Sequence, residues 1–201
     1  MSTALAYYSP VQISRVALQM LGATPIDSFE DDTPEAISCR DVWPLARDAA
    51  LQEYPWTFAT AIDRITPEPI DEDNPPPFDS YYFQLPGKCL RVLNVYDADT
   101  NEEITDWQVV GDKLLIPTDN TIYLKYIKSV DATSDWSPMF CVAVSYKMAS
   151  MLAGQYNADL INAMTVLYGQ AIENAIVRDR DQEPQQDDCL LNPLQLARYR
   201  A

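Results

Sequence analysis

The spacing of hydrophobic residues changes twice along this chain, and this change constrains the fold more than any other feature of the sequence. Apolar residues recur every three or four positions over about 9–53, every second position over about 81–130, and every three or four positions again over about 137–178. The first spacing is typical of helices that bury one face, and the second is typical of strands. The sequence therefore predicts the α+β class: a four-helix bundle interrupted by a small antiparallel β-rich insertion, with an extended C-terminal tail.

The same pattern predicts where each part of the chain begins and ends. We expect a helical bundle domain from residues 1–56 and 132–180, a β-rich insertion domain from 57–131, and a C-terminal docking tail from 181–201. The helices are expected near 9–21, 34–53, 138–154 and 159–178. Extended segments are expected at 57–65, 81–85, 89–96, 107–110, 113–116 and 121–127, with the last five forming one small antiparallel sheet.

Start and stop signals support these helix boundaries. Three helix starts combine a Ser or Thr, whose oxygen can cap free backbone amides, with a Pro suited to the first helical position. They are Ser9-Pro10, Thr33-Pro34 and Ser137-Pro138. Gly22 and Gly154 are expected to end the first and third helices. We expect a kink at Pro44, because a proline inside a helix removes one hydrogen bond.

One hairpin can be identified from its turn residues. Gly111 and Asp112 separate two runs of apolar residues, which is the spacing of a tight two-residue turn. Glycine supplies the positive φ that such a turn requires. We therefore expect 107–110 and 113–116 to pair as neighbouring antiparallel strands.

The charge balance excludes several classes of protein. The chain has 30 acidic and 14 basic residues, a net charge of −16, and no histidine. It therefore lacks the residue needed for Ser-His-Asp or Cys-His catalysis, for histidine metal sites and for histidine pH switches. Binding nucleic acid through its phosphates needs clustered Lys and Arg, so the acidity argues against it. A protein that lets DNA pass without adhering to it stays possible.

Composition also argues against several specialised sites. The cysteines, Cys39, Cys89, Cys141 and Cys189, lack the paired spacing of a zinc or redox site, so we expect free and mostly buried thiols. The five glycines are dispersed and form no phosphate-binding loop. We expect no cofactor and no metal. The N-terminal segment lacks the features of a secretory signal and no stretch is apolar enough to span a membrane, so we expect synthesis in the cytoplasm.

Two acidic clusters are candidate catalytic groups. Asp71, Glu72 and Asp73 lie among prolines, and a second run, 30–32, precedes the second helix. Paired carboxylates can act as general acid and base, so Asp71, Glu72 or Asp73 could serve a carboxylate-dependent hydrolase of cell-wall polysaccharide. Neither cluster has the spacing of a calcium loop. We expect both to be solvated loop charge, and the protein not to be an enzyme.

The end of the chain differs from the rest. Residues 189–201, CLLNPLQLARYRA, contain no acidic residue and several leucines. A segment this short cannot form its own core, which favours docking on another protein. The expected docking residues are Leu190, Leu191, Leu194, Leu196, Arg198, Tyr199 and Arg200. Tyrosine is frequent in interface cores, and the chain has 12 tyrosines, which also favours an interaction protein.

A series of short motifs resembles the bacteriophage tail tubular protein A family, the head-to-tail connector or adaptor proteins of tailed phages. The resemblance begins with LGATPIDSFEDDTPEA…C…VW…ARDAAL…YPWTFA and continues through VVGDKLLIP, TIYLKYI and DWSPMF. Together these motifs cover roughly residues 10–180. The chain departs from the family at Pro44 and beyond Asp181. The signature residues, for which a structural role is expected, are Arg47, Pro55, Trp56, Gly111, Trp136, Pro138 and Phe140.

The resemblance implies a structural virion protein. Twelve copies would form a ring beneath the portal protein, join the capsid to a downstream tail or nozzle protein, and line the channel through which DNA leaves. The protein would be made in the host cytoplasm and located in the neck or tail region of the virion. The alternatives are a non-virion assembly factor, a tail-completion protein and, least favoured, the cell-wall hydrolase.

Overall fold

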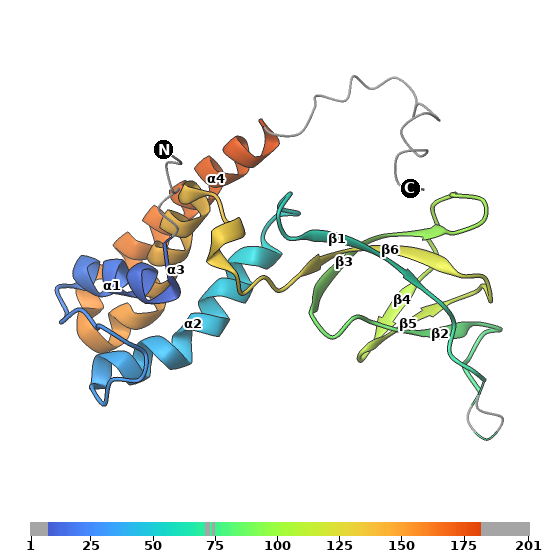
Figure 1. Cartoon of the computed structure of the whole chain (residues 1–201), viewed down its shortest axis with the longest axis horizontal. Coiled ribbons are helices and arrows are strands. Elements are labelled where there is room, and N and C mark those ends of the chain that lie inside the picture. The colour runs from blue at the N-terminus through green and yellow to red at the C-terminus, as the bar shows by residue number, and fades with distance from the viewer. Residues whose placement is uncertain (1–7, 71–72, 74, 182–201) are drawn as a thin grey trace, which may run out of the picture.

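The computed structural model describes residues 8–70, 73 and 75–181 of the chain. Helices gather at one end of the molecule and strands at the other (Figure 1). The helices are α1 (Pro10–Leu21), α2 (Pro34–Gln52), α3 (Pro138–Tyr156) and α4 (Ile161–Arg180). The strands are β1 (Thr60–Ile65), β2 (Tyr81–Gln84), β3 (Cys89–Asp97), β4 (Gln108–Val110), β5 (Lys113–Ile116) and β6 (Ile122–Lys128). The predicted α+β class is confirmed. We call α1–α4 the helical unit and β1–β6 the β unit.

The predicted helix starts are confirmed. The Ser9 hydroxyl accepts a hydrogen bond from the Gln12 amide at 3.2 Å, and the Gln12 side chain accepts one from the Ser9 amide at 2.8 Å. The Thr33 hydroxyl caps α2, and the Ser137 hydroxyl caps α3 in the same way, each at 3.2 Å. A proline follows each cap, so these boundaries follow from local sequence alone.

Two expectations about helix ends differ in outcome. Gly22 ends α1 with a left-handed φ of 72°, as expected. The third helix, expected to stop near Gly154, continues two residues past it to Tyr156 and is capped by Asn157, whose φ is −158°. A short 3-10 turn, Ala158–Leu160, then leads into α4. α2 runs as one helix through Pro44 to Gln52.

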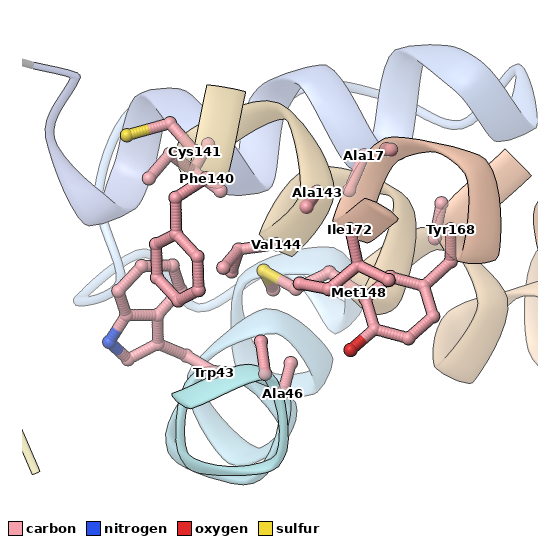
Figure 2. Close-up of a cluster of buried hydrophobic side chains, with 14 of the residues drawn as sticks. Ala17, Trp43, Ala46, Phe140, Cys141, Ala143, Val144, Met148, Tyr168 and Ile172 are labelled. Carbon is pink, nitrogen blue, oxygen red and sulfur yellow. The ribbon is translucent and has the colours of Figure 1, made fainter. Parts of the chain in front are cut away.

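Helix α3 lies at the centre of the helical unit and contacts each of the other three helices. Its buried side chains lie among side chains from α1, α2 and α4 (Figure 2). The labelled residues are Ala17 of α1, Trp43 and Ala46 of α2, Phe140, Cys141, Ala143, Val144 and Met148 of α3, and Tyr168 and Ile172 of α4. The alanines let the helix backbones approach closely. The larger side chains fill the space between them.

The strands form two three-stranded antiparallel sheets and not the single sheet that the sequence predicts. One sheet has the order β1-β6-β3, which we call sheet A, and the other has the order β2-β5-β4. The edge of β3 is already occupied, because Tyr96 pairs with Glu103 and the Ile104 amide donates to the Val95 carbonyl at 2.8 Å. The β4–β5 hairpin therefore pairs with β2. Its predicted turn is confirmed, with Gly111 at a φ of 64°.

The two sheets share one small core. Its buried members come from both sheets: Phe83, Val95, Leu114, Ile116, Ile122, Leu124 and Tyr126. The end of β6 contributes instead to the core of the helical unit, through Ile127 and the nearby Val130. Trp56 and Ala59, between α2 and β1, also lie in the helical core. The two segments that connect the helical unit to the β unit are thus both buried in the helical core.

Candidate interaction surfaces

A chain of aromatic rings lies where the two units are joined. It consists of Phe29, Trp43, Tyr54, Trp56, Phe58, Trp136 and Phe140. We call this cluster the aromatic seam. It combines rings from α2, from the start of α3 and from the segment between α2 and β1, so it fixes these parts of the chain against one another.

Phe140 is at the centre of the seam. Its ring lies 4.8 Å from Trp56, 5.2 Å from Phe58 and 4.9 Å from Trp136, measured between centroids, and all three pairs are edge-on. Trp136 in turn stacks on Trp43 at 5.8 Å. Edge-on and offset stacking are the favoured geometries of aromatic pairs, so each contact contributes beyond simple burial. Trp43, Trp56 and Trp136 are all buried, and Trp107 is half-buried against the core of the β unit.

The other signature residues have distinct positions. Pro138 is the first residue of α3 and Pro55 lies directly before Trp56, so both are next to the seam in sequence. Gly111 lies apart from the seam, in the β4–β5 turn. The structure therefore brings together Trp56, Trp136 and Phe140.

Arg47 holds the end of the β unit against α2. Its guanidinium bonds to Asp48 at 2.8 Å and to Asp131, and Asp131 also accepts from the Lys88 ammonium at 3.2 Å. The hydrogen bond to Asp48 raises the pKa of Arg47 against the opposing effect of burial. The Asp48 carboxylate also accepts from the Ser129 hydroxyl at 2.9 Å. Arg47 is half-buried and paired with carboxylates.

Sequence reasoning missed a buried carboxylate at the end of α4. Asp179 is 2% exposed and accepts hydrogen bonds from the Thr57 amide at 3.0 Å and the Thr57 hydroxyl at 2.9 Å. It thus ties α4 to Thr57, which lies between the seam residues Trp56 and Phe58. The available signal was its position, because an acidic residue in the last turn of a helix is unfavourable unless another group compensates.

The α3–α4 hairpin presents a surface with few charges. Residues 138–177 contain only Lys147, Asp159 and Glu173 as charged residues. α4 packs chiefly on α3 and leaves its other side exposed. The exposed large apolar side chains of the hairpin are Val142, Met151, Ile161, Val166 and Val177. Val142 and Met151 lie on opposite sides of α3, so these five side chains do not form one patch. The low charge of the hairpin is what lets it approach another protein without burying many charged groups.

The β unit carries acidic groups at the end far from the helices. Two loops meet there, because the Asp97 carboxylate accepts from the Asn120 side chain at 2.8 Å and from the Asp99 and Thr100 amides. The hydrogen bond from Asn120, followed by those from the backbone, lowers the pKa of Asp97. These bonds hold Asp99, Glu102 and Asp119 at one place with their side chains exposed. We call these three residues the acidic tip.

Several predicted site residues lie outside the described part of the chain. They are the docking residues Leu190, Leu191, Leu194, Leu196, Arg198, Tyr199 and Arg200, and also Cys189, Asp71 and Glu72. Asp73 is described and is exposed. An exposed carboxylate lacks the desolvation that a catalytic acid needs.

Two cysteines and two tyrosines have surroundings that indicate a structural role. Cys39 and Cys141 are free, buried thiols, and burial raises the pKa of each to about 11. Two tyrosines have internal partners: Tyr126 donates to Asp63 at 2.8 Å, and Tyr168 donates to Glu53 at 3.1 Å. Burial is the main cause of the raised pKa of both hydroxyls. Among residues 8–70, 73 and 75–181, no group of His, Cys, Asp and Glu could hold a metal ion.

A shallow cleft of about 300 Å³ beside α1 is lined by Tyr8, Gln12, Arg15, Val16 and Gln19. Within the described part of the chain, no helix is long and apolar enough to cross a membrane.

The sequence matches no protein-family model, and no curated protein is significantly similar to it.

Proposed function

We propose that this protein is a structural virion protein, a head-to-tail connector that forms a ring beneath a phage portal and joins it to the next tail component. The observation that carries this proposal is the order of the elements. Two helices, a β-rich unit and two more helices follow one another, with an aromatic seam at both crossings. This is the order of the family that the sequence motifs resemble.

The surfaces of the two units support the proposal. A closed ring of identical copies requires two different surfaces on each copy, because each contact joins unlike faces. The α3–α4 hairpin offers a face with few charges, and the β unit offers a strongly charged one. Residues 61–131 hold 6 basic and 14 acidic residues, so their net charge is 6 − 14 = −8. Repeated around a channel, this charge would repel DNA and keep it from adhering during ejection.

We propose that the C-terminal tail docks on the portal. This part of the proposal rests on its sequence, since four leucines lie within residues 190–196 and the last charged residues are Arg198 and Arg200. A basic, leucine-rich segment can order on a partner that offers an apolar groove bordered by carboxylates. Removal of residues 189–201 should leave the fold unchanged and abolish binding to purified portal rings.

The tail is tested by a pull-down of portal rings with purified full-length and shortened chains. A matched control replaces Gln185 and Gln186 with Ser, which changes the same region without removing a leucine. Loss of binding in the shortened chain, with binding kept in the control, is the expected result. A shortened chain that binds portal rings as well as the full chain overturns the docking role.

Mass spectrometry and cryo-electron microscopy of purified particles test the assignment as a connector. The expected result is a stoichiometric component of the mature particle that forms a ring in the neck. Absence from mature particles would favour the alternative of an assembly factor. Presence elsewhere in the tail, with no ring at the portal, would favour a tail-completion protein.

A further inference from the structure

The outward face of sheet A carries an ordered set of side chains. Directly opposed residues of antiparallel strands point to the same face, so the strand register places them in rows. The rows are Thr60–Ile127–Arg91, Ile62–Lys125–Asn94 and Arg64–Tyr123–Tyr96, each written from β1 through β6 to β3. Alternate residues of β6, namely Ile122, Leu124 and Tyr126, are buried in the core between the sheets. The rows therefore form the face that sheet A turns away from that core.

The row nearest the helices is partly covered, and the other two rows are open. Ile127 belongs to the core of the helical unit. Farther along the sheet, Ile62 is 59% exposed and Arg64 is exposed. Lys125, Tyr96 and Tyr123 lie beside them and are half-buried. Arg91, at the β3 end of the first row, is also exposed. We call Arg64, Arg91, Lys125, Tyr96 and Tyr123 the sheet platform.

The sheet platform is basic, in contrast to the unit that carries it. Three of the six basic residues of 61–131 lie on it, and in the described part of the chain none of the three forms an ion pair. Two of the other three do form ion pairs: Lys88 with Asp131 and Lys113 with Glu68. The acidic residue beside the platform is Glu103, whose carboxylate accepts from the Asn94 side chain at 2.7 Å.

The acidic tip has the complementary property. Asp99, Glu102 and Asp119 form no ion pair with the cations of residues 8–70, 73 and 75–181 of their own chain. Their two loops are fixed by the hydrogen bonds of Asp97, so three carboxylates are presented together. One copy of the β unit thus offers an unpaired basic face and an unpaired acidic end.

We propose that the sheet platform of one copy binds the acidic tip of a second copy. The contact is heterologous, joining unlike surfaces, so it can be repeated from copy to copy and can close into a ring. Tyrosine and arginine are enriched at the centres of protein interfaces, and complementary charge sets the orientation of the partners. This inference deepens the proposed connector function and rests on it.

A second copy fits the platform better than a nucleic acid does. Three cations are few for phosphate binding, and a chain of net charge −16 repels a polyanion as a whole. The acidic tip, by contrast, is a local anion on a protein whose other surfaces can contribute to the contact. The platform therefore selects a small cluster of carboxylates.

Zero-length cross-linking tests the contact directly. Full-length chains, one half labelled with ¹⁵N, are mixed at low salt, alone or on portal rings, and treated with a carbodiimide. This reagent joins an amine to a carboxylate that already lies against it. We expect cross-links from Lys125 to Asp99, Glu102 or Asp119 in which one peptide is labelled and the other is not. High salt should remove them, because exposed charges are then screened.

Charge-reversal variants distinguish the contact between the sheet platform and the acidic tip from other modes of self-association. Oligomer is measured here without cross-linker, by analytical ultracentrifugation, because Lys125→Glu also removes the amine that the carbodiimide would join. Lys125→Glu with Arg64→Glu should lower the oligomer fraction about tenfold or more, because like charges would then oppose one another. Asp99→Lys with Asp119→Lys should do the same, and combining all four changes should restore the oligomer. Arg178→Glu, the same charge change on an exposed position of α4, is the matched control and should leave the oligomer fraction unchanged.

The outcomes separate this inference from the proposed function. Oligomers that persist in all charge reversals would overturn the platform contact and leave the connector intact. A wild-type chain that forms no oligomer, free or on portal rings, would overturn both. Binding of a fluorescent single-stranded oligonucleotide that Lys125→Glu abolishes, without mixed-label cross-links at Lys125, would show that the platform takes a nucleic acid and would overturn the inference.

Discussion

The helical unit and the β unit divide stability and charge between them. The helical core is extensive, and ten of its buried members are alanines, which let α3 pack closely against three neighbours. The β core has seven buried members, all large except Val95. Each of its two sheets packs into this core through one face, so each strand also presents a row of side chains on its outer face. The helical unit therefore supplies most of the buried contact, whereas the β unit supplies the charged surface.

The aromatic seam is the strongest test of this comparison, because it joins the two units. Replacing Phe140, which is fully buried, with Ala removes ring contacts to Trp56, Phe58 and Trp136. We expect the free energy of unfolding to fall by about 3–5 kcal/mol. Urea denaturation followed by tryptophan fluorescence and circular dichroism measures this fall. Phe78→Ala is the control, because Phe78 is 90% exposed and its loss should cost less than about 0.5 kcal/mol.

A deletion in the β core should act more locally. Leu124 is fully buried between the two sheets, so Leu124→Ala should cost about 2–5 kcal/mol. The smaller core shares no member with the helical one, so we expect the loss of protection to be greatest in the strands. Hydrogen exchange measures this for each amide. Equal loss of protection in α3 and β6 would mean that the two units unfold together.

The buried carboxylate of α4 is expected to have the next largest effect. Asp179→Ala leaves the Thr57 amide without its partner, which costs about 1–3 kcal/mol. Asp181→Ala, two residues further along, removes an exposed carboxylate and serves as the control. Chemical denaturation of both variants measures the difference. Equal stabilities would show that the bonds to Thr57 do not contribute.

Local signals in the sequence predicted most of the elements. Each Ser-Pro or Thr-Pro start became a capped helix, and the Gly111 turn became a hairpin, because these features depend on neighbouring residues alone. The division into two sheets could not be predicted in this way. It depends on residues 102–104 occupying the edge of β3, and a pairing across a loop leaves no periodic signal.

The surfaces were harder to predict than the elements. The signature residues Trp56, Trp136 and Phe140 were named from sequence, but their meeting in one seam depends on tertiary packing. The acidity of the β unit was visible in the composition. Its separation into a basic face and an acidic tip was not, because the face of each residue depends on strand register.

Asp97, whose hydrogen bonds fix the acidic tip, provides a smaller effect on stability that depends on pH. The pKa of Asp97 lies below its ordinary value of 3.8, chiefly because of the hydrogen bond from Asn120. A carboxylate whose pKa is lower in the folded protein stabilises it above the ordinary pKa, and this contribution disappears as pH falls through the folded value. Asn120→Ala should therefore reduce stability more at pH 7 than at pH 2. Thermal unfolding of the wild-type and Asn120→Ala chains at both values measures this. A difference that is independent of pH would contradict this role.

The smallest expected effect is a gain in stability, and it concerns the helix end that the sequence misplaced. Gly154 lies inside α3, and a Cβ added there would meet no heavy atom within 4 Å. Gly154→Ala should therefore raise the free energy of unfolding by about 0.5–1 kcal/mol, because alanine loses less backbone entropy in a helix. Gly22 is equally open but has a φ of 72°, so Gly22→Ala should lower stability by about 1–2 kcal/mol. Urea denaturation of the pair compares the same added methyl group in two backbone conformations. A loss of stability at Gly154 would mean that the last turn of α3 needs a glycine, as the sequence first indicated.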